Sequence, residues 1–348
     1  LSNALVGNKA PEQIALGDAI KMSAQLKMRI EAHTWVKEIQ SEQHQLILEK
    51  EGQQSTQPYS KLVLAIGANP VRLAIAGDGS DDIHVVNNLN DYKTFRKNLA
   101  IRQDKRVVIL GAGLIGCEFA NDLQNTEHQV TVIDLASRPL GRLIPEYVAA
   151  SFQEKLEEIG IHFVLGTTVE KVIKVENGDY QITLANGQSV IADIVLSAIG
   201  LQPNVELAKA TNITCSRGIL TNGLLETNQT DIYAIGDCAL HFNPFAGRNI
   251  RLESVQNAND QAKTAVLHIV GRPQIYQAVP WFWTNQFDLK LQMAGINTEY
   301  DRFEIKGEAP KFSVYYYKND QLIAVDSLNK PADHLAARKA LAEQFVNR

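Results

Sequence analysis

The chain has few cysteines, and none of them lies close to another in the sequence. Cys117, Cys215 and Cys238 are the three cysteines among 348 residues, and they form no CxxC or similar short pair. Dithiol redox centres and zinc sites are commonly built on such pairs, so the sequence disfavours both. Free cysteines are typical of a reducing compartment, and the first residues show no secretory signal pattern. We therefore expect a cytoplasmic protein.

Long apolar runs and an excess of positive charge are also missing. No apolar segment approaches the roughly 18 residues of a membrane span, so none is expected. Lys and Arg number 34 against 39 Asp and Glu, and the formal net charge of −5 disfavours nucleic-acid binding, because phosphates are held by basic surfaces. This length, with 45% hydrophobic residues, predicts two or three globular domains.

Two segments of the chain resemble each other without gaps, namely residues 36–70 and 169–203. Each consists of short alternating stretches and ends in an apolar run that closes with Ala-Ile-Gly, followed three residues later by proline. The pattern predicts, in each copy, a three-strand antiparallel meander that leads into a buried parallel strand. Ile66, Gly67 and Gly200 close these two parallel strands, and we expect them to contact a cofactor there.

A strand–helix–strand unit stands before the second copy. Residues 105–110 predict a buried strand, a helix is expected from about residue 115 to 124, and a second strand over 129–135. If the two halves are repeats, the first copy should follow a similar unit, whose glycine motif would lie upstream of Leu1. We therefore expect that a first dinucleotide-binding segment is missing from the start of the chain. The alternative is two similar meanders of independent origin.

The segment Gly111-Ala-Gly113-Leu-Ile-Gly116 is a GxGxxG motif between a buried strand and a helix. In this setting the first glycine permits a tight turn, the second lets a pyrophosphate approach, and the third lets helix and strand pack closely. The helix start favours an anion. Asp134 ends the following strand, where its carboxylate would bind ribose hydroxyls and favour NADH over NADPH. The alternative is a glycine turn with a purely structural role.

Glu118 lies in the first helical turn after the glycine motif, and two roles fit it. A carboxylate there interacts favourably with the helix dipole. It could also reach toward the nicotinamide ring and fix its pose, which would make Glu118 the candidate catalytic residue. The sequence leaves both roles open.

A second motif joins the apolar strand at 232–235 to Gly236 and Asp237. The glycine permits a close backbone approach. The acid stands at the carboxyl end of the strand, where α/β sheets bind ligands, and could accept a hydrogen bond from a cofactor hydroxyl. The alternative is a simple turn aspartate.

Together these motifs carry a family resemblance. The segments GAGLIG, LAIGANP, SAIGLQPN and YAIGDCA resemble those of flavoprotein reductases with two dinucleotide-binding folds. Residues 1–240 are most similar to bacterial rubredoxin–NAD reductases. The tail, with RLESVQNANDQAK and PWFWTNQFDLKLQ, is more similar to the ferredoxin reductases of ring-hydroxylating dioxygenases and P450 systems.

The resemblance implies FAD and NADH as cofactors. Asp237 would hold the ribityl chain of FAD, and Glu253, Ser254 and Val255 would open a helix aimed at the pyrimidine edge of the flavin. The dipole of such a helix would stabilise the negative charge of the reduced ring. Trp283 would lie near the isoalloxazine on the partner-facing side; alternatively it is a core aromatic residue.

The resemblance also implies an electron acceptor. The first candidate is rubredoxin, which would serve an alkane hydroxylase, and the second is a [2Fe–2S] ferredoxin of a dioxygenase or P450 system. A third interpretation is a non-catalytic or redox-sensing flavoprotein fragment. Both acceptors are acidic, so basic residues of the tail such as Lys290, Arg302 and Lys311 are docking candidates.

The expected fold is therefore α/β, with two Rossmann-like domains that carry inserted meanders, and a C-terminal α+β domain. We expect the flavin-binding domain over residues 1–100 and 226–275, and the NAD-binding domain over 101–225. The C-terminal domain, 276–348, would cover the flavin or form a homodimer face.

Overall fold

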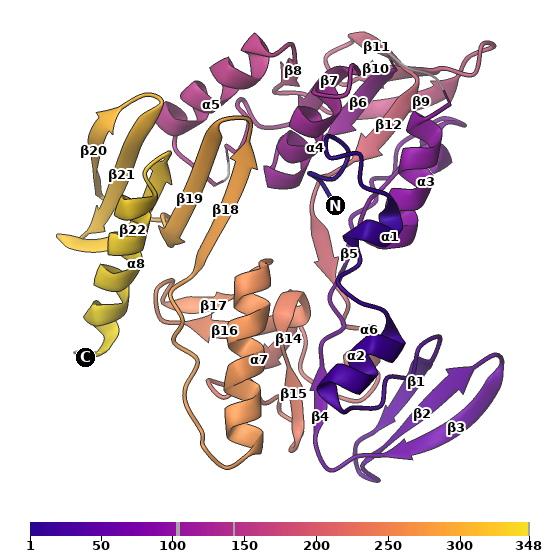
Figure 1. The fold of residues 1–348 in the computed structure, drawn as a ribbon, viewed down its shortest axis with the longest axis vertical. Coiled ribbons are helices and arrows are strands. Elements are labelled where there is room, and N and C mark those ends of the chain that lie inside the picture. The colour runs from indigo at the N-terminus through magenta and orange to yellow at the C-terminus, as the bar shows by residue number, and fades with distance from the viewer. Residues whose placement is uncertain (102–104, 142, 347–348) are drawn as a thin grey trace.

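The computed structural model describes residues 1–101, 105–141 and 143–346 (Figure 1). A four-stranded parallel sheet forms the centre of the upper half of the view. Its order is β12-β6-β7-β8, and its members are β6 (Arg106–Leu110), β7 (Gln129–Asp134), β8 (His162–Leu165) and β12 (Ile194–Ser197). Helices cover it: α3 (Leu89–Leu99), α4 (Leu114–Gln124) and α5 (Glu146–Glu158). The predicted strand–helix–strand unit is confirmed.

Both copies of the repeat form the predicted meander. The first consists of β1 (Trp35–Gln40), β2 (Gln45–Lys50) and β3 (Gln53–Pro58), and leads into β4 (Leu62–Leu64). The second consists of β9 (Val169–Lys174), β10 (Tyr180–Leu184) and β11 (Ser189–Ala192), and leads into β12. As expected, β4 and β12 are parallel strands: β12 pairs with β6, and β4 pairs with β15 (Ile232–Ala234).

The two copies meet at their last residues. Strand β5 (Ala68–Pro70) pairs antiparallel with β13 (Leu201–Pro203). Pro70 lies opposite Leu201, Asn69 opposite Gln202, and Ala68 opposite Pro203. These are equivalent positions of the repeat, so the register is the one that an approximate twofold axis between the two copies produces.

The remaining elements of the lower half surround β15. They are β14 (Ile219–Thr221), β16 (Ala239–Asn243), β17 (Arg248–Ile250), α6 (Glu206–Lys209), α7 (Val255–Ile269) and the 3₁₀ turn η2 (Gly236–Cys238). Helices α1 (Pro11–Ile14) and α2 (Ala19–Leu26) precede the first meander, and the turn η1 (Ser80–Asp82) follows it. No helix in the described part of the chain combines the length and apolarity that crossing a bilayer requires.

The C-terminal region is the predicted α+β unit. Its antiparallel sheet has the order β18-β19-β22-β21-β20. The strands are β18 (Trp281–Gln286), β19 (Leu289–Gly295), β20 (Arg302–Glu308), β21 (Lys311–Lys318) and β22 (Gln321–Leu328). Helix α8 (Pro331–Val346) packs on β19 and β22. One apolar cluster continues from Ile109 of the parallel sheet through Phe152 of α5 to Phe312, so the C-terminal sheet shares a core with the parallel sheet.

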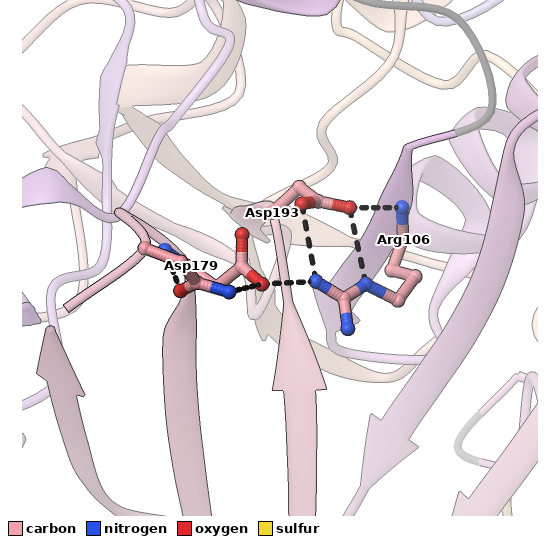
Figure 2. A network of polar contacts seen from close by, with 4 residues as sticks. Arg106, Asp179 and Asp193 are labelled. Carbon is pink, nitrogen blue, oxygen red and sulfur yellow. Dashed lines mark hydrogen bonds and ion pairs between the residues drawn. The ribbon is translucent and has the colours of Figure 1, made fainter. Parts of the chain in front are cut away.

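An ion-pair network ties the second meander to the parallel sheet (Figure 2). Arg106, the first residue of β6, donates to Asp193 from its backbone nitrogen at 2.7 Å and from Nε and Nη2 at 3.2 Å each. Its Nη2 also pairs with Asp179. Although burial opposes it, hydrogen bonding to Arg106 holds the pKa of Asp193 below its ordinary value.

Candidate functional site

The three glycines of the loop between β6 and α4 have different surroundings. A Cβ atom on Gly111, whose φ is +106°, would lie 2.5 Å from the Ala198 carbonyl oxygen, and one on Gly116 would lie 1.9 Å from the Gly111 oxygen. No heavy atom lies within 4 Å of the corresponding position on Gly113. The first and third glycines are therefore required by packing, whereas the second faces open space.

The start of α4 can accept an anion. Gly113 is its N-cap and provides no side-chain hydrogen bond to the first helical turn. The amides of that turn are thus open to a ligand, beside the space that Gly113 leaves. The donor set fits a pyrophosphate.

Asp134 lies at the end of β7, as the sequence predicts, and also organises the loop. Its Oδ2 accepts from the Ala112 nitrogen at 2.6 Å, and its Oδ1 from the Ala136 nitrogen at 2.7 Å. The carboxylate is only partly buried. Each oxygen therefore retains a lone pair with which a ribose hydroxyl could interact.

Glu118 lies beyond the first turn of α4, contrary to the expectation, because the helix already begins at Leu114. Its side chain projects toward two segments that are distant in the sequence. Its Oε2 accepts from the Ser2 hydroxyl at 2.5 Å and its Oε1 from the Thr284 hydroxyl of β18 at 2.7 Å. One turn further along, Asp122 accepts from the backbone nitrogens of Leu5 and Val6. The first residues of the chain therefore lie along α4, with β18 against the same helix.

The second motif places Asp237 at the end of β15, within η2. Gly236 has φ +72°, and its nitrogen donates to Gln261 Oε1 of α7 at 2.7 Å. Burial raises the pKa of the Asp237 carboxyl, with Arg251 opposing. Within the described residues this half-buried carboxylate receives no hydrogen bond, so it is open to a cofactor hydroxyl.

Glu253, Ser254 and Val255 stand at the start of α7, as predicted. Ser254 caps the helix by accepting from the Asn257 nitrogen at 3.1 Å, whereas Glu253 pairs with Arg251 at 2.5 Å. Val255 is 70% exposed, so its side chain is accessible to a bound ring. Helix α7 packs against both η2 and β18.

Ile66, Gly67 and Gly200 lie where β4 and β12 end. Gly67 and Gly200 both have positive φ, and no atom lies within 4 Å of their missing Cβ positions. The carbonyls of Ile66 and Gly67 accept from the side chain and backbone of Asn204, at 2.7 and 3.0 Å. These two hydrogen bonds join the ends of the two repeat copies, and no local sequence signal pointed to them.

Trp283 is not a core residue. It is 44% exposed and stacks on Trp281, with ring centroids 5.2 Å apart. The Arg338 guanidinium lies 4.1 Å from the Trp281 ring centroid. Because strand residues alternate, β18 presents the two tryptophans on one face and Thr284 on the face toward α4.

Three arginines that the sequence did not single out line a cavity of about 300 Å³. Arg251 donates to the carbonyls of Asp237 and Leu201, whereas the exposed Arg217 and Arg248 form no ion pair with any described residue. Ile296, directly after β19, forms part of the apolar wall. Of the predicted docking residues, Arg302 is already engaged by Glu304, and Lys290 and Lys311 are exposed.

Comparison with known proteins gives two family matches. The model described as Pyridine nucleotide-disulphide oxidoreductase matches residues 1–262, and the one described as Reductase C-terminal matches residues 281–346. The chain is 74% identical over 240 residues to the rubredoxin-NAD(+) reductase of Acinetobacter baylyi, a match that covers 69% of this chain and 61% of that protein.

More distant relatives cover more of the chain. Rhodocoxin reductase of Rhodococcus erythropolis is 34% identical over 289 residues, which cover 82% of this chain and 67% of that protein. Among solved structures, the covalent putidaredoxin reductase–putidaredoxin complex matches with a TM-score of 0.91 and 30% identity, over 98% of this chain and 82% of that chain.

Proposed function

This chain belongs to the pyridine nucleotide-disulphide oxidoreductase family, and within it we propose an FAD-dependent reductase that takes electrons from NADH and passes them to rubredoxin. The contact of β18 with both α4 and α7 carries the proposal, because these helices begin at the two predicted cofactor motifs. When bound, the nicotinamide and the flavin supply the redox chemistry, and the protein supplies position and electrostatics.

The nicotinamide cofactor would be held by the loop of Gly111, Gly113 and Gly116. The open side of Gly113 and the free amides of α4 fit its pyrophosphate. Asp134 would bind the ribose and repel a 2′-phosphate, which favours NADH.

The flavin would lie between η2 and the start of α7. Asp237 has the unused acceptor capacity that a ribityl hydroxyl needs, and the buried Gly236 before it turns the backbone at a φ of +72°. The N-terminus of α7, a helix of 15 residues, would stabilise negative charge on a reduced ring.

Rubredoxin is the preferred acceptor because of the 74% identity to a rubredoxin-NAD(+) reductase. Rubredoxin would in turn pass the electrons to an alkane hydroxylase. The exposed Arg217 and Arg248 of the cavity fit an acidic partner, and Ile296 connects the cavity to the sheet that carries Trp283.

A [2Fe–2S] ferredoxin of a dioxygenase or P450 system is the second candidate acceptor. The likeness to the ferredoxin–NAD(+) reductase component of the anthranilate 1,2-dioxygenase system of Burkholderia cepacia, 32% identical over 98% of this chain, favours it. The described cysteines are free, which fits direct electron transfer without a dithiol.

Stopped-flow spectroscopy of the purified protein tests the proposal. NADH should bleach the flavin absorbance faster than NADPH does, and rubredoxin should restore it faster than a [2Fe–2S] ferredoxin. Faster reoxidation by the ferredoxin would select the second acceptor. A protein that holds flavin but is not reduced by NADH would instead support the redox-sensing alternative.

A further inference from the structure

Glu118 is held by hydroxyls from two other parts of the molecule. Its two carboxylate oxygens have different donors, Ser2 at 2.5 Å and Thr284 at 2.7 Å. Two fixed points define the orientation of the carboxylate plane, which one hydrogen bond would leave free to rotate. Each oxygen keeps a lone pair for a ligand.

The Thr284 hydroxyl is itself oriented. Thr284 is fully buried, and Gln286 Nε2, which is 1% exposed, lies 3.4 Å from Thr284 Oγ1 as a donor. The hydroxyl oxygen therefore accepts from Gln286, and its hydrogen is directed to Glu118. A buried hydroxyl needs a partner, and here its partner is the candidate catalytic carboxylate.

The donor belongs to the C-terminal sheet, whereas Glu118 belongs to the helix of the glycine loop. We propose that Thr284 is a positioning residue, whose hydroxyl fixes the Glu118 carboxylate toward the nicotinamide end of the bound dinucleotide. The C-terminal sheet thus completes the dinucleotide site. This inference rests on the proposed function.

Binding of two ligands to flavin-loaded protein tests the proposal by calorimetry. NAD⁺ carries the nicotinamide ring, and ADP-ribose lacks it. Thr284→Val keeps the shape but removes the hydroxyl, and should weaken NAD⁺ binding about tenfold, as expected for a lost hydrogen bond to a charged group, while changing ADP-ribose binding less than about twofold. Thr284→Ser should restore the affinity for NAD⁺.

Two controls separate positioning from general destabilisation. Ser327→Ala removes another fully buried hydroxyl of the same sheet, which contacts Ser313 and not Glu118; it should leave the ratio of the two affinities unchanged. In a Glu118→Ala background, Thr284→Val should have no further effect on that ratio, because its target is gone.

The outcomes are distinguishable. The positioning role would be overturned if Thr284→Val left the ratio of the NAD⁺ and ADP-ribose affinities unchanged. It would also be overturned if Thr284→Val still changed that ratio in the Glu118→Ala background. Either result would leave the proposed function standing. A wild-type protein that binds neither ligand would overturn the proposed function and this inference together.

Discussion

The two copies of the repeat share a pattern and a topology but differ in burial. In the second copy β12 pairs with β6, and its Leu196 is 1% exposed. In the first, β4 pairs with β15, and Val63 at the equivalent position is 38% exposed. The same local pattern therefore produces the same strands, whereas the neighbouring layers decide how much each strand contributes to stability.

The largest expected loss of stability comes from the contact between Gly111 of the glycine loop and Ala198 of the second copy. Gly111→Ala would place a Cβ atom 2.5 Å from the Ala198 oxygen at a φ of +106°. We expect a loss of more than about 3 kcal/mol in the free energy of unfolding, measured by urea denaturation. In the first copy, Gly67 has a φ of +64°, and no heavy atom lies within 4 Å of its missing Cβ position, so Gly67→Ala creates no clash. It should cost only the left-handed strain of about 1–2 kcal/mol. Equal losses would contradict the difference in packing.

The ion-pair network is a feature of the second copy, because Ser60 occupies the position equivalent to Asp193 in the first. Arg106→Gln should destabilise the protein by about 2 kcal/mol, since it removes the guanidinium that is hydrogen-bonded to Asp193 and Asp179. Because the Arg106 side chain is 36% exposed, solvent screens these ion pairs, and the loss is smaller than for a fully buried pair. Asp193→Asn should cost less when combined with Arg106→Gln than alone. Additive losses would show that the two residues do not interact.

The first residues of the two copies offer an identical pair. Val169 is 6% exposed and Val36 is 37% exposed. Val169→Ala should lower the free energy of unfolding by about 1–2 kcal/mol, and Val36→Ala by less than about 0.5 kcal/mol. The shift of the urea midpoint measures both, and a larger loss at Val36 would reverse the comparison.

The smallest effect is a pH dependence that belongs to the second copy. Because the pKa of Asp193 is below its ordinary value of 3.8, its stabilising contribution is present above that pH and is lost as the pH falls toward the folded-state value. Between roughly pH 5 and pH 2, the thermal unfolding temperature should fall less steeply with falling pH in Arg106→Gln than in wild type. A parallel decline would assign the acid loss to other carboxylates.

Much of the fold could be predicted because its signals are local. The signals for the strand before Gly111, for the alternating strands of the two meanders and for the apolar runs that close with Ala-Ile-Gly each lie within a few residues, and the structure confirms each element. The roles of Asp134, Asp237 and Trp283 toward cofactors stay predictions. Their positions at strand ends, or exposed on β18, are compatible with those roles.

Contacts between distant segments were not predictable. Thr284 meets Glu118 across 166 positions, and Gln261 of α7 meets Gly236 across 25 positions. No periodicity relates such residues, because a hydrophobic pattern predicts which face of a helix or strand is buried but not which other element covers that face. The arginine cavity was missed for the same reason, since its members come from separate loops and strands.

The sequence alone determined the elements, their repeat and the glycine turns, because backbone preferences and apolar periodicity act over one or two turns of chain. Only the tertiary structure decided which carboxylate is clamped, which glycine faces open space and which copy of the repeat is buried. These outcomes depend on the packing of whole layers, where a hydrogen bond or a void is fixed by side chains that lie far apart along the chain.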